Sequence, residues 1–174
     1  MPMHTRTVII YTGARIRVPE HIQRIDTHST HGWQMRYGTP SLFFSDGHGQ
    51  GSGPRASLKR AMVALRERIE ALPAPTGLQR DISPHTQTDL PVGISGPILR
   101  QRPGRTVPEC HFSVNLPRFG AKPLRRSVYI ANQNTYTKER YQRALASAIA
   151  LRRAAEAAYQ EAATAAKRRS AVKL

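Results

Sequence analysis

The chain has little that would tie it together covalently or hold it in a membrane. Its single cysteine, Cys110, excludes a disulfide within the chain. It has no run of about 18 apolar residues, so we expect no membrane span and no membrane partner. The short apolar segment Val8–Tyr11 is too brief for a secretory signal. We therefore expect a cytoplasmic location, at the nucleoid.

Acidic side chains are also scarce. The chain has 27 Lys and Arg against 11 Asp and Glu, which gives a formal net charge of +16. Such an excess repels itself in the compact state and attracts polyanions, namely DNA, RNA and anionic membrane surfaces, and of these we expect nucleic acid rather than a membrane as the partner. Residues 98–174 hold 16 of the basic side chains but only four of the acidic ones, so we expect the second half to bind phosphate more strongly.

Residues suited to catalysis or metal binding are sparse and scattered. A structural zinc needs three or four converging ligands, and His28, His31 and His48 have no cysteine pair to complete a site. Cys110 and His111 are neighbours on a predicted strand, so their side chains should point to opposite faces. No Ser-His-Asp or paired-carboxylate pattern stands out. We therefore expect a protein that is not an enzyme and has no cofactor and no metal.

Strand-like and helix-like patterns follow one another in the first part of the chain. An N-terminal strand is expected around Val8–Tyr11. Alternation of apolar and polar residues predicts further strands at residues 22–26, 32–37 and 42–45. Pro54 suits the first position of a helix, and Pro73 would end it. The buried stripe of this helix is expected to comprise Leu58, Ala61, Met62, Leu65, Ile69 and Leu72. Residues 1–72 thus form the predicted first module.

The same order repeats after residues 73–97, which are rich in Pro, Gly, Ser and Thr and predict a linker. Strands are expected at residues 98–102, 110–115 and 125–130, with a loop at 116–123. Thr137 can cap a long helix that runs to about residue 165, followed by a basic tail at 166–174. The helix would bury Tyr141, Leu145, Ala148 and Ile149. We therefore predict an α+β protein of two modules, each a three-stranded antiparallel sheet packed on one helix.

A sheet that is covered on one side presents alternate side chains on the other side. For the first module these are predicted to be Arg24, Asp26, Gln34, Arg36, Phe43 and Ser45. For the second module they are Arg100, Arg102, His111, Ser113, Asn115, Arg125, Ser127 and Tyr129, with Arg118 and Lys122 in the connecting loop. Arginine can contact guanine or phosphate, Gln and Asn can pair with adenine, and hydroxyl groups commonly contact phosphate. Solvated faces of ordinary sheets are the simpler alternative, but the basic excess favours nucleic acid.

The segments Ile22–Asp26, His31–Tyr37 and Phe43–Gly47, with the helical stretch RASLKRAMVALRERI, resemble the ethylene-response-factor (Apetala-type) DNA-binding domain in its bacterial or phage form. Cys110–Asn115, Arg125–Ile130 and the stretch YQRALASA resemble it more loosely, as a second divergent copy. The resemblance implies that the polar face of each sheet enters the major groove. The positions that match base and phosphate contacts of the family are Arg24, Gln34 and Arg36, and then Arg100, Arg102, Ser113 and Arg125.

Two departures from the family pattern concern the first module. Ser41, Leu42 and Phe43 stand where the third strand of the family has a basic residue, and the loop at 46–53 is rich in glycine. Both point to weaker binding, or another role, for this module. The loop gives freedom before the helix, and its backbone N–H groups could alternatively meet a phosphate at the helix start.

The sequence favours a double-stranded DNA-binding protein, either a transcriptional regulator or a nucleoid-associated factor. Two alternatives remain open. One is an RNA-binding or ribosome-associated protein, which would contact phosphates and 2′-hydroxyls. The other is a protein-interaction module whose charge only aids solubility. The sequence also leaves open whether the chain forms a homodimer.

Overall fold

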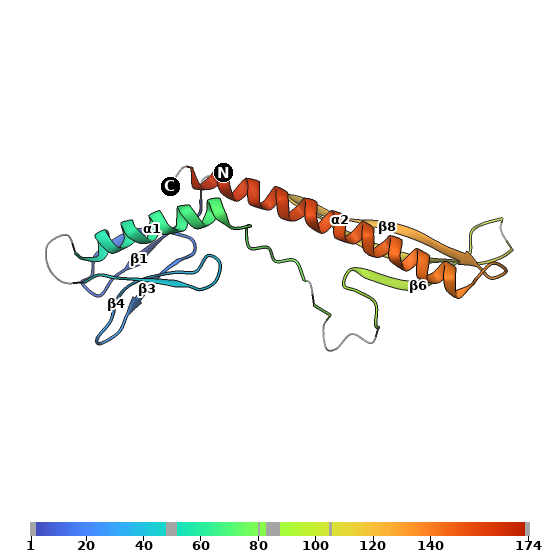
Figure 1. The fold of residues 1–174 in the computed structure, drawn as a ribbon, viewed down its shortest axis with the longest axis horizontal. Coiled ribbons are helices and arrows are strands. Elements are labelled where there is room, and N and C mark those ends of the chain that lie inside the picture. The colour runs from blue at the N-terminus through green and yellow to red at the C-terminus, as the bar shows by residue number, and fades with distance from the viewer. Residues whose placement is uncertain (1–2, 48–51, 80, 83–87, 105, 173–174) are drawn as a thin grey trace. The chain divides into compact units, whose positions relative to one another are not determined.

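The computed structural model describes residues 3–47, 52–79, 81–82, 88–104 and 106–172 (Figure 1). The chain divides into two compact units, one made of Met1–Pro75 with Ala163–Leu174 and the other of Thr76–Ala162. The described residues form three antiparallel sheets and two helices. The predicted α+β class is therefore confirmed.

The first unit contains two small sheets and a helix. Its elements are β1 (Thr5–Ile9), β2 (Arg15–Pro19), β3 (Ile22–Asp26), β4 (His31–Met35), β5 (Leu42–Ser45) and α1 (Pro54–Ala71). The predicted order of three strands and a helix over residues 22–72 is confirmed. The expectation of one N-terminal strand is wrong, because β1 and β2 form a hairpin of their own.

The core of the first unit lies between the β3–β5 sheet and α1. Trp33, Met35 and Tyr37 are almost completely buried, as their alternation predicts. The apolar stripe of α1 covers them. The indole Nε1 of Trp33 donates a hydrogen bond of 2.7 Å to the carbonyl of Pro54, which holds the start of α1 against β4. Pro54 occupies the first turn of the helix, where its missing N–H costs nothing.

The second unit contains one three-stranded sheet and most of the long helix. Its elements are β6 (Ile94–Arg100), β7 (Glu109–Arg118), β8 (Ala121–Asn132) and α2 (Lys138–Ala171). The predicted linker at 73–97 is too long, since Ile94 and Ser95 already pair with β7. The predicted loop at 116–123 is also wrong, because β7 and β8 form a hairpin that turns at Phe119 and Gly120.

The core of the second unit lies between one face of this sheet and α2. Phe112 and Val114 from β7 are fully buried together with Ala144 and Ala148 from α2. The ring of Phe112 meets the ring of Tyr141 edge-on at 5.1 Å between centroids. Burying one Phe side chain contributes about 2 kcal/mol, and the small alanines let the helix backbone approach the sheet closely.

The helix α2 begins at the predicted cap but ends later than expected. The Thr137 hydroxyl accepts a hydrogen bond of 3.2 Å from the Arg140 backbone N–H. The helix then continues to Ala171, so the predicted basic tail at 166–174 is wrong. Within the first unit, Lys167 Nζ lies 2.6 Å from Glu20 Oε1, and Arg168 donates to the carbonyl of Glu70 at 2.7 Å. Lys167 and Arg168, two cations of the expected basic tail, are therefore bonded within the first unit.

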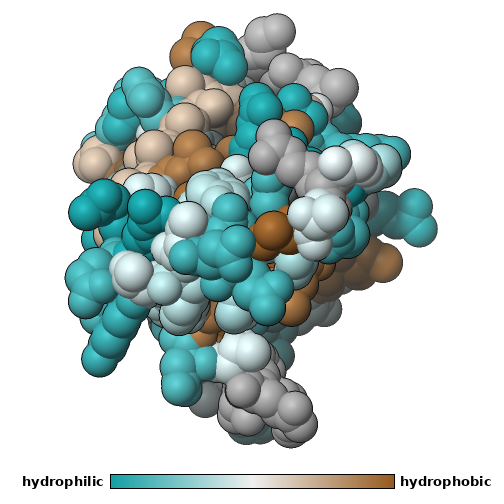
Figure 2. Space-filling model, turned by 90° about the vertical axis from the view of Figure 1, so that its right-hand side faces the viewer, coloured by the Kyte–Doolittle hydropathy of each residue, from teal (hydrophilic) through white to brown (hydrophobic). Residues whose placement is uncertain are grey.

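The described residues include no helix with enough length and apolar character to cross a membrane. The face drawn in Figure 2 is largely hydrophilic, and hydrophobic side chains form only small areas on it. Small apolar areas of this kind are ordinary on a protein surface.

The buried end of α2 generates a stability prediction. Ala171 is 1% exposed in the core of the first unit, whereas its neighbour Val172 is 82% exposed. Ala171→Glu should lower the free energy of unfolding by about 2 kcal/mol or more, because it buries an unpaired charge. Val172→Glu should change it by less than about 0.5 kcal/mol. Urea unfolding followed by the fluorescence of Trp33, the single tryptophan, measures both. Equal stability of the two variants would contradict the docking of the helix end.

Candidate nucleic-acid interface

The face of the β6–β8 sheet that points away from α2 is defined by its register. Because Phe112 and Val114 face α2, their neighbours along β7 lie on the opposite side. Three cross-strand pairs compose this side: His111 with Tyr129, Ser113 with Ser127, and Asn115 with Arg125. We call it the second sheet face, and it carries these six residues together with Ser95, Ile98 and Arg100 of β6 and Glu109 of β7. All six were predicted to share this face.

Arginines lie toward both ends of the second sheet face. Arg100 is paired with Glu109 in the register, while Arg125 is paired with Asn115. The two pairs are six positions apart along β7, which corresponds to roughly 20 Å along the strand. Arg102 lies beyond the end of β6 rather than within it, and its Nε is 2.9 Å from Glu109 Oε2. Its side chain is still 59% exposed, so it remains accessible at that end.

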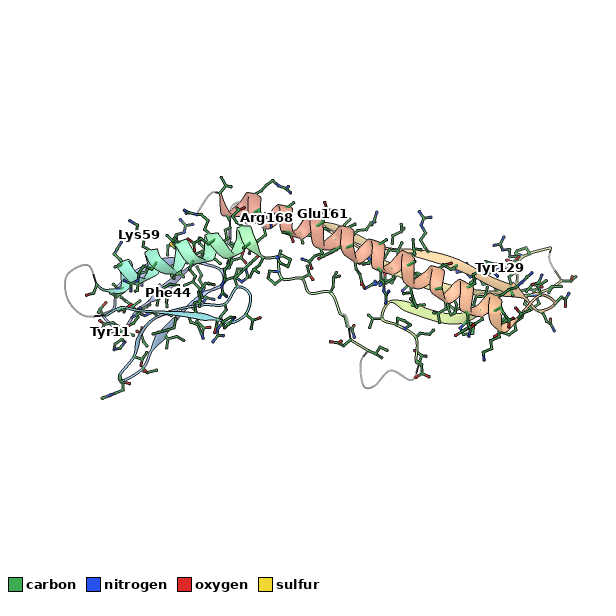
Figure 3. All side chains as sticks on the ribbon, viewed as in Figure 1. Tyr11, Phe44, Lys59, Tyr129, Glu161 and Arg168 are labelled. Carbon is green, nitrogen blue, oxygen red and sulfur yellow. The ribbon has the colours of Figure 1, made fainter. Side chains whose placement is uncertain are left out.

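His111 and Tyr129 form the aromatic part of the second sheet face. Their rings meet edge-on at 5.4 Å between centroids. Tyr129, labelled on β8 in Figure 3, is 47% exposed, whereas the His111 side chain is 8% exposed. His111 Nε2 lies 3.5 Å from Glu109 Oε2, but neither ring nitrogen has a hydrogen-bond partner among the described residues. Tyr129 is therefore the aromatic side chain that a base could reach.

The two cations of the β7–β8 hairpin do not belong to this face. Arg118 Nε donates to the carbonyl of Lys122 at 2.9 Å. Arg118 also lines an apolar groove with Phe119 and Tyr159, on the side of the sheet where α2 packs. Arg118 and Lys122, predicted to bind nucleic acid from the connecting loop, thus lie apart from the second sheet face, and Lys122 is an exposed side chain at the hairpin end.

Cys110 and His111 lie on opposite faces of β7, as their adjacency predicts. Cys110 packs with the core under α2, while His111 belongs to the second sheet face. Burial raises the pKa of the Cys110 thiol, which keeps it protonated at neutral pH. The two groups therefore do not form a thiolate–imidazole pair.

In the first unit, the predicted base-contacting Arg24 is buried on the α1 side of its sheet. Its register partner is Trp33, and its guanidinium lies 4.9 Å from the centre of that ring. Arg24 Nη2 is 2.6 Å from Asp46 Oδ2 and 2.7 Å from Asp26 Oδ1. The Arg24 side chain is 5% exposed. The prediction that Arg24 and Asp26 face outward is wrong, because Ile22 is buried and residues 22, 24 and 26 share one face.

The charges around Arg24 are mutually satisfied. Ser57 Oγ donates a hydrogen bond of 2.5 Å to Asp46 Oδ1, and the Tyr11 backbone N–H donates to Asp26 Oδ2 at 3.2 Å. Burial alone would raise the pKa of Asp46, but hydrogen bonds from Arg24 and Ser57 outweigh it and hold that pKa below its ordinary value. The pKa of Asp26 is lowered in the same way, against burial, by Arg24 and His31. Arg24 has a structural role here.

The outer face of the β3–β5 sheet is nearly neutral. Gln34 lies on it as predicted, paired in the register with Gln23 and Phe43. Arg36, just past β4, donates from Nε to Gln34 Oε1 at 2.7 Å, and Gln34 Nε2 donates to Ser41 at 3.3 Å. Of the cations predicted for this face, Arg36 alone remains exposed there. The first sheet is a poor phosphate-binding surface.

Half of the glycine-rich stretch 46–53 falls outside the described residues, which do not include 48–51 and thus His48. At its edges, the Gly53 N–H donates to the Asp46 carbonyl at 2.7 Å, so the loop is closed by a backbone hydrogen bond. In the part of the chain that is described, no three His, Cys, Asp or Glu side chains converge as metal ligands would.

A second basic surface was missed in the sequence. A groove of about 420 Å³ in the first unit lies between β2 and α1. Its basic side chains are Arg15, Arg17, Arg55, Lys59 and Arg66, and we call it the cationic groove. Two patterns in the sequence indicate the two sides of the cationic groove. Arg15 and Arg17 alternate with the buried Ile16 and Val18, and Arg55, Lys59 and Arg66 recur at helical spacing.

The residues proposed from the sequence thus separate into an assembled set on the second sheet face and a dispersed set elsewhere. No protein-family model, curated protein or solved structure matches this chain.

The Arg24 cluster generates a prediction of acid sensitivity. The folded-state pKa of Asp46 lies below its unfolded value of about 3.9, so its stabilisation is present above about pH 4 and is lost as the pH falls through the folded value. Asp46→Asn should lower the free energy of unfolding at pH 7 by about 3 kcal/mol and weaken its dependence on acid.

The matched control is Glu67→Gln, an exposed neutralisation on α1 in the same unit. It should change stability by less than about 0.5 kcal/mol. Urea unfolding monitored by Trp33 fluorescence between pH 2 and 7 compares the two variants with the parent. If Asp46→Asn follows the parent curve, the cluster does not stabilise the fold.

Proposed function

We propose that this chain is a double-stranded DNA-binding protein, a transcriptional regulator or nucleoid-associated factor of the ethylene-response-factor type, that acts without catalysis. The observation that carries the proposal is the composition of the second sheet face. It combines arginines toward both ends with the hydrogen-bonding side chains of Ser113, Asn115 and Ser127 between them. The positive excess of the second half of the chain supports the same partner.

The size of the second sheet face suits the major groove of B-form DNA. Neighbouring strands are about 4.8 Å apart, so three strands span roughly 10 Å between their outer backbones. The major groove is about 12 Å wide and admits β-structure. Arg125 is exposed and carries no ion pair within the described residues, so it is free to bind guanine or a phosphate. Asn115 beside it can pair with adenine.

The exposed charge of each sheet decides which unit we assign to the reading of DNA. Arg24 is neutralised by two carboxylates, so we do not assign it a DNA contact. Gln34 and Arg36 bond to each other on a neutral sheet face. We therefore assign direct reading of DNA to the second unit.

Neutralising the arginines of the second unit tests this assignment. The triple variant Arg100→Gln, Arg102→Gln, Arg125→Gln should bind duplex DNA more weakly and flatten its salt dependence. Each arginine that no longer neutralises a phosphate should reduce the slope of log K against log salt by about 0.9. Fluorescence anisotropy with a labelled duplex at several salt concentrations measures the slope.

The matched control removes the same charge from other parts of the second unit. Arg126→Gln, Arg140→Gln and Arg143→Gln change exposed side chains, on the opposite face of β8 and on α2. This variant should keep the slope of the parent. An unchanged slope in the first triple variant, or an equal decrease in both, would exclude the second sheet face as the binding surface.

A competition between nucleic acids separates DNA from RNA as the partner. The deep, narrow major groove of A-form RNA does not admit a sheet. Duplex RNA should therefore displace labelled duplex DNA at least about tenfold less well than unlabelled DNA of the same length at the same salt. Preference for RNA would favour a ribosome- or RNA-associated role, and binding of neither would favour a protein-interaction module.

A further inference from the structure

The cationic groove of the first unit is built from two elements that are far apart in the sequence. The strand β2 supplies Arg15 and Arg17, which share one face because the buried Ile16 lies between them. The helix α1 supplies the other three cations along one stripe beside its buried face. Lys59 is labelled on this helix in Figure 3. The floor consists of Ile16, Leu58, Met62 and Val63.

Within the described part of the chain, no ion pair compensates the charge of the cationic groove. Arg17 donates to the Thr5 hydroxyl at 2.9 Å, which is a neutral partner. Among the described residues, none of the five cations forms an ion pair, and no carboxylate lines the groove. This contrasts with Arg24, which has two carboxylates within 2.7 Å. Uncompensated positive charge at this density is unfavourable in the free protein, so the groove should favour an anionic partner.

The dimensions of the cationic groove point to an extended polyanion. Arg55 and Arg66 are eleven residues apart on α1, which corresponds to roughly 16 Å along the helix axis. Arg15 and Arg17 are about 7 Å apart along β2. A single small anion would occupy only part of this row. Duplex DNA carries one charge per about 1.7 Å of its axis, so its backbone can meet all five cations.

The apolar floor does not require an apolar ligand. Ile16 and Leu58 are less than 8% exposed, so they belong to the core beneath the groove. The aliphatic stems of Arg and Lys cover apolar surface while their charged ends reach solvent. Val63 is 47% exposed, and a lone exposed valine is ordinary on a protein surface. The five cations are therefore the feature that selects the partner.

We infer that the cationic groove is a second DNA-binding surface that holds the phosphate backbone without reading bases. The inference rests on the proposed function, but it uses a different unit and a different set of residues. The five side chains are point charges or guanidinium groups around a groove, with no Asn or Gln among the lining residues to pair with adenine. Contacts of this kind raise affinity for every sequence alike.

The test compares two double variants that remove the same charge from exposed positions. Lys59→Gln with Arg66→Gln removes two groove cations. Arg60→Gln with Arg169→Gln is the control, because neither residue lines the groove. The groove variant should reduce the slope of log K against log salt for duplex DNA by about two, and equally for unrelated sequences. The control should keep the slope of the parent, and Lys59→Arg with Arg66→Lys should do so too.

The outcomes separate this inference from the proposed function. A slope that falls only in the second-unit triple variant would overturn the groove and leave the proposed function standing. A slope that falls only in the groove variant would support the groove and reject the second sheet face. If the groove variant no longer binds polyglutamate but binds DNA as the parent does, the groove takes an acidic protein, which overturns the inference. Trp33 fluorescence verifies that each variant is folded.

Discussion

Both candidate surfaces depend on the alternation of side chains along a strand. In β7, the burial of Phe112 and Val114 under α2 obliges Ser113 and Asn115 to face the other way. In β3, the burial of Ile22 obliges Arg24 to share its side of the sheet. Alternation along the strand thus leaves Ser113 and Asn115 available to a partner in the second unit, and it buries Arg24 in the first unit.

The burial of Arg24 explains why the sheet of the first unit exposes fewer arginines than the sheet of the second unit. A guanidinium on the core side of a sheet is stable only if its charge is paired and its N–H groups are bonded, and Asp26 and Asp46 provide both. Ser57 at the start of α1 completes the cluster by bonding to Asp46. The strand, the loop before the helix and the helix itself are therefore linked through one buried charge. The result favours a structural role for this side chain over a recognition role.

The packing of helices on sheets also determines where the positive side chains of each unit are exposed. In the second unit, arginines lie toward the ends of an open sheet, where hydrogen-bonding side chains separate them. In the first unit, the unpaired cations lie instead around a groove between β2 and α1. On the proposed function, the first arrangement suits reading of bases and the second suits retention of the backbone. Two surfaces on one chain would also raise each other's effective concentration at a shared duplex.

The sequence by itself determined the elements and most of their buried faces. Period-two alternation identified Trp33 and Phe112 as core residues, and helical spacing identified the stripe of α1, because local periodicity directly records which side is buried. The polar composition of the second sheet face followed from the same pattern. The alternation of Arg15, Ile16 and Arg17 records the buried side of β2 in the same way.

Only the tertiary structure decided which charges are free. In strand Ile22–Asp26 the two isoleucines lie on opposite faces, so the sequence could not say whether Ile22 or Ile25 faces the helix. Arg24 lies on the same face as Ile22, so its burial depended on which isoleucine faces the helix. Asp46 lies 22 residues from Arg24, and Glu20 lies 147 residues from Lys167, so no local pattern could reveal these ion pairs. The cationic groove likewise exists because β2 and α1 pack together. Pairing of distant charges depends on packing, and packing is a property of the whole fold.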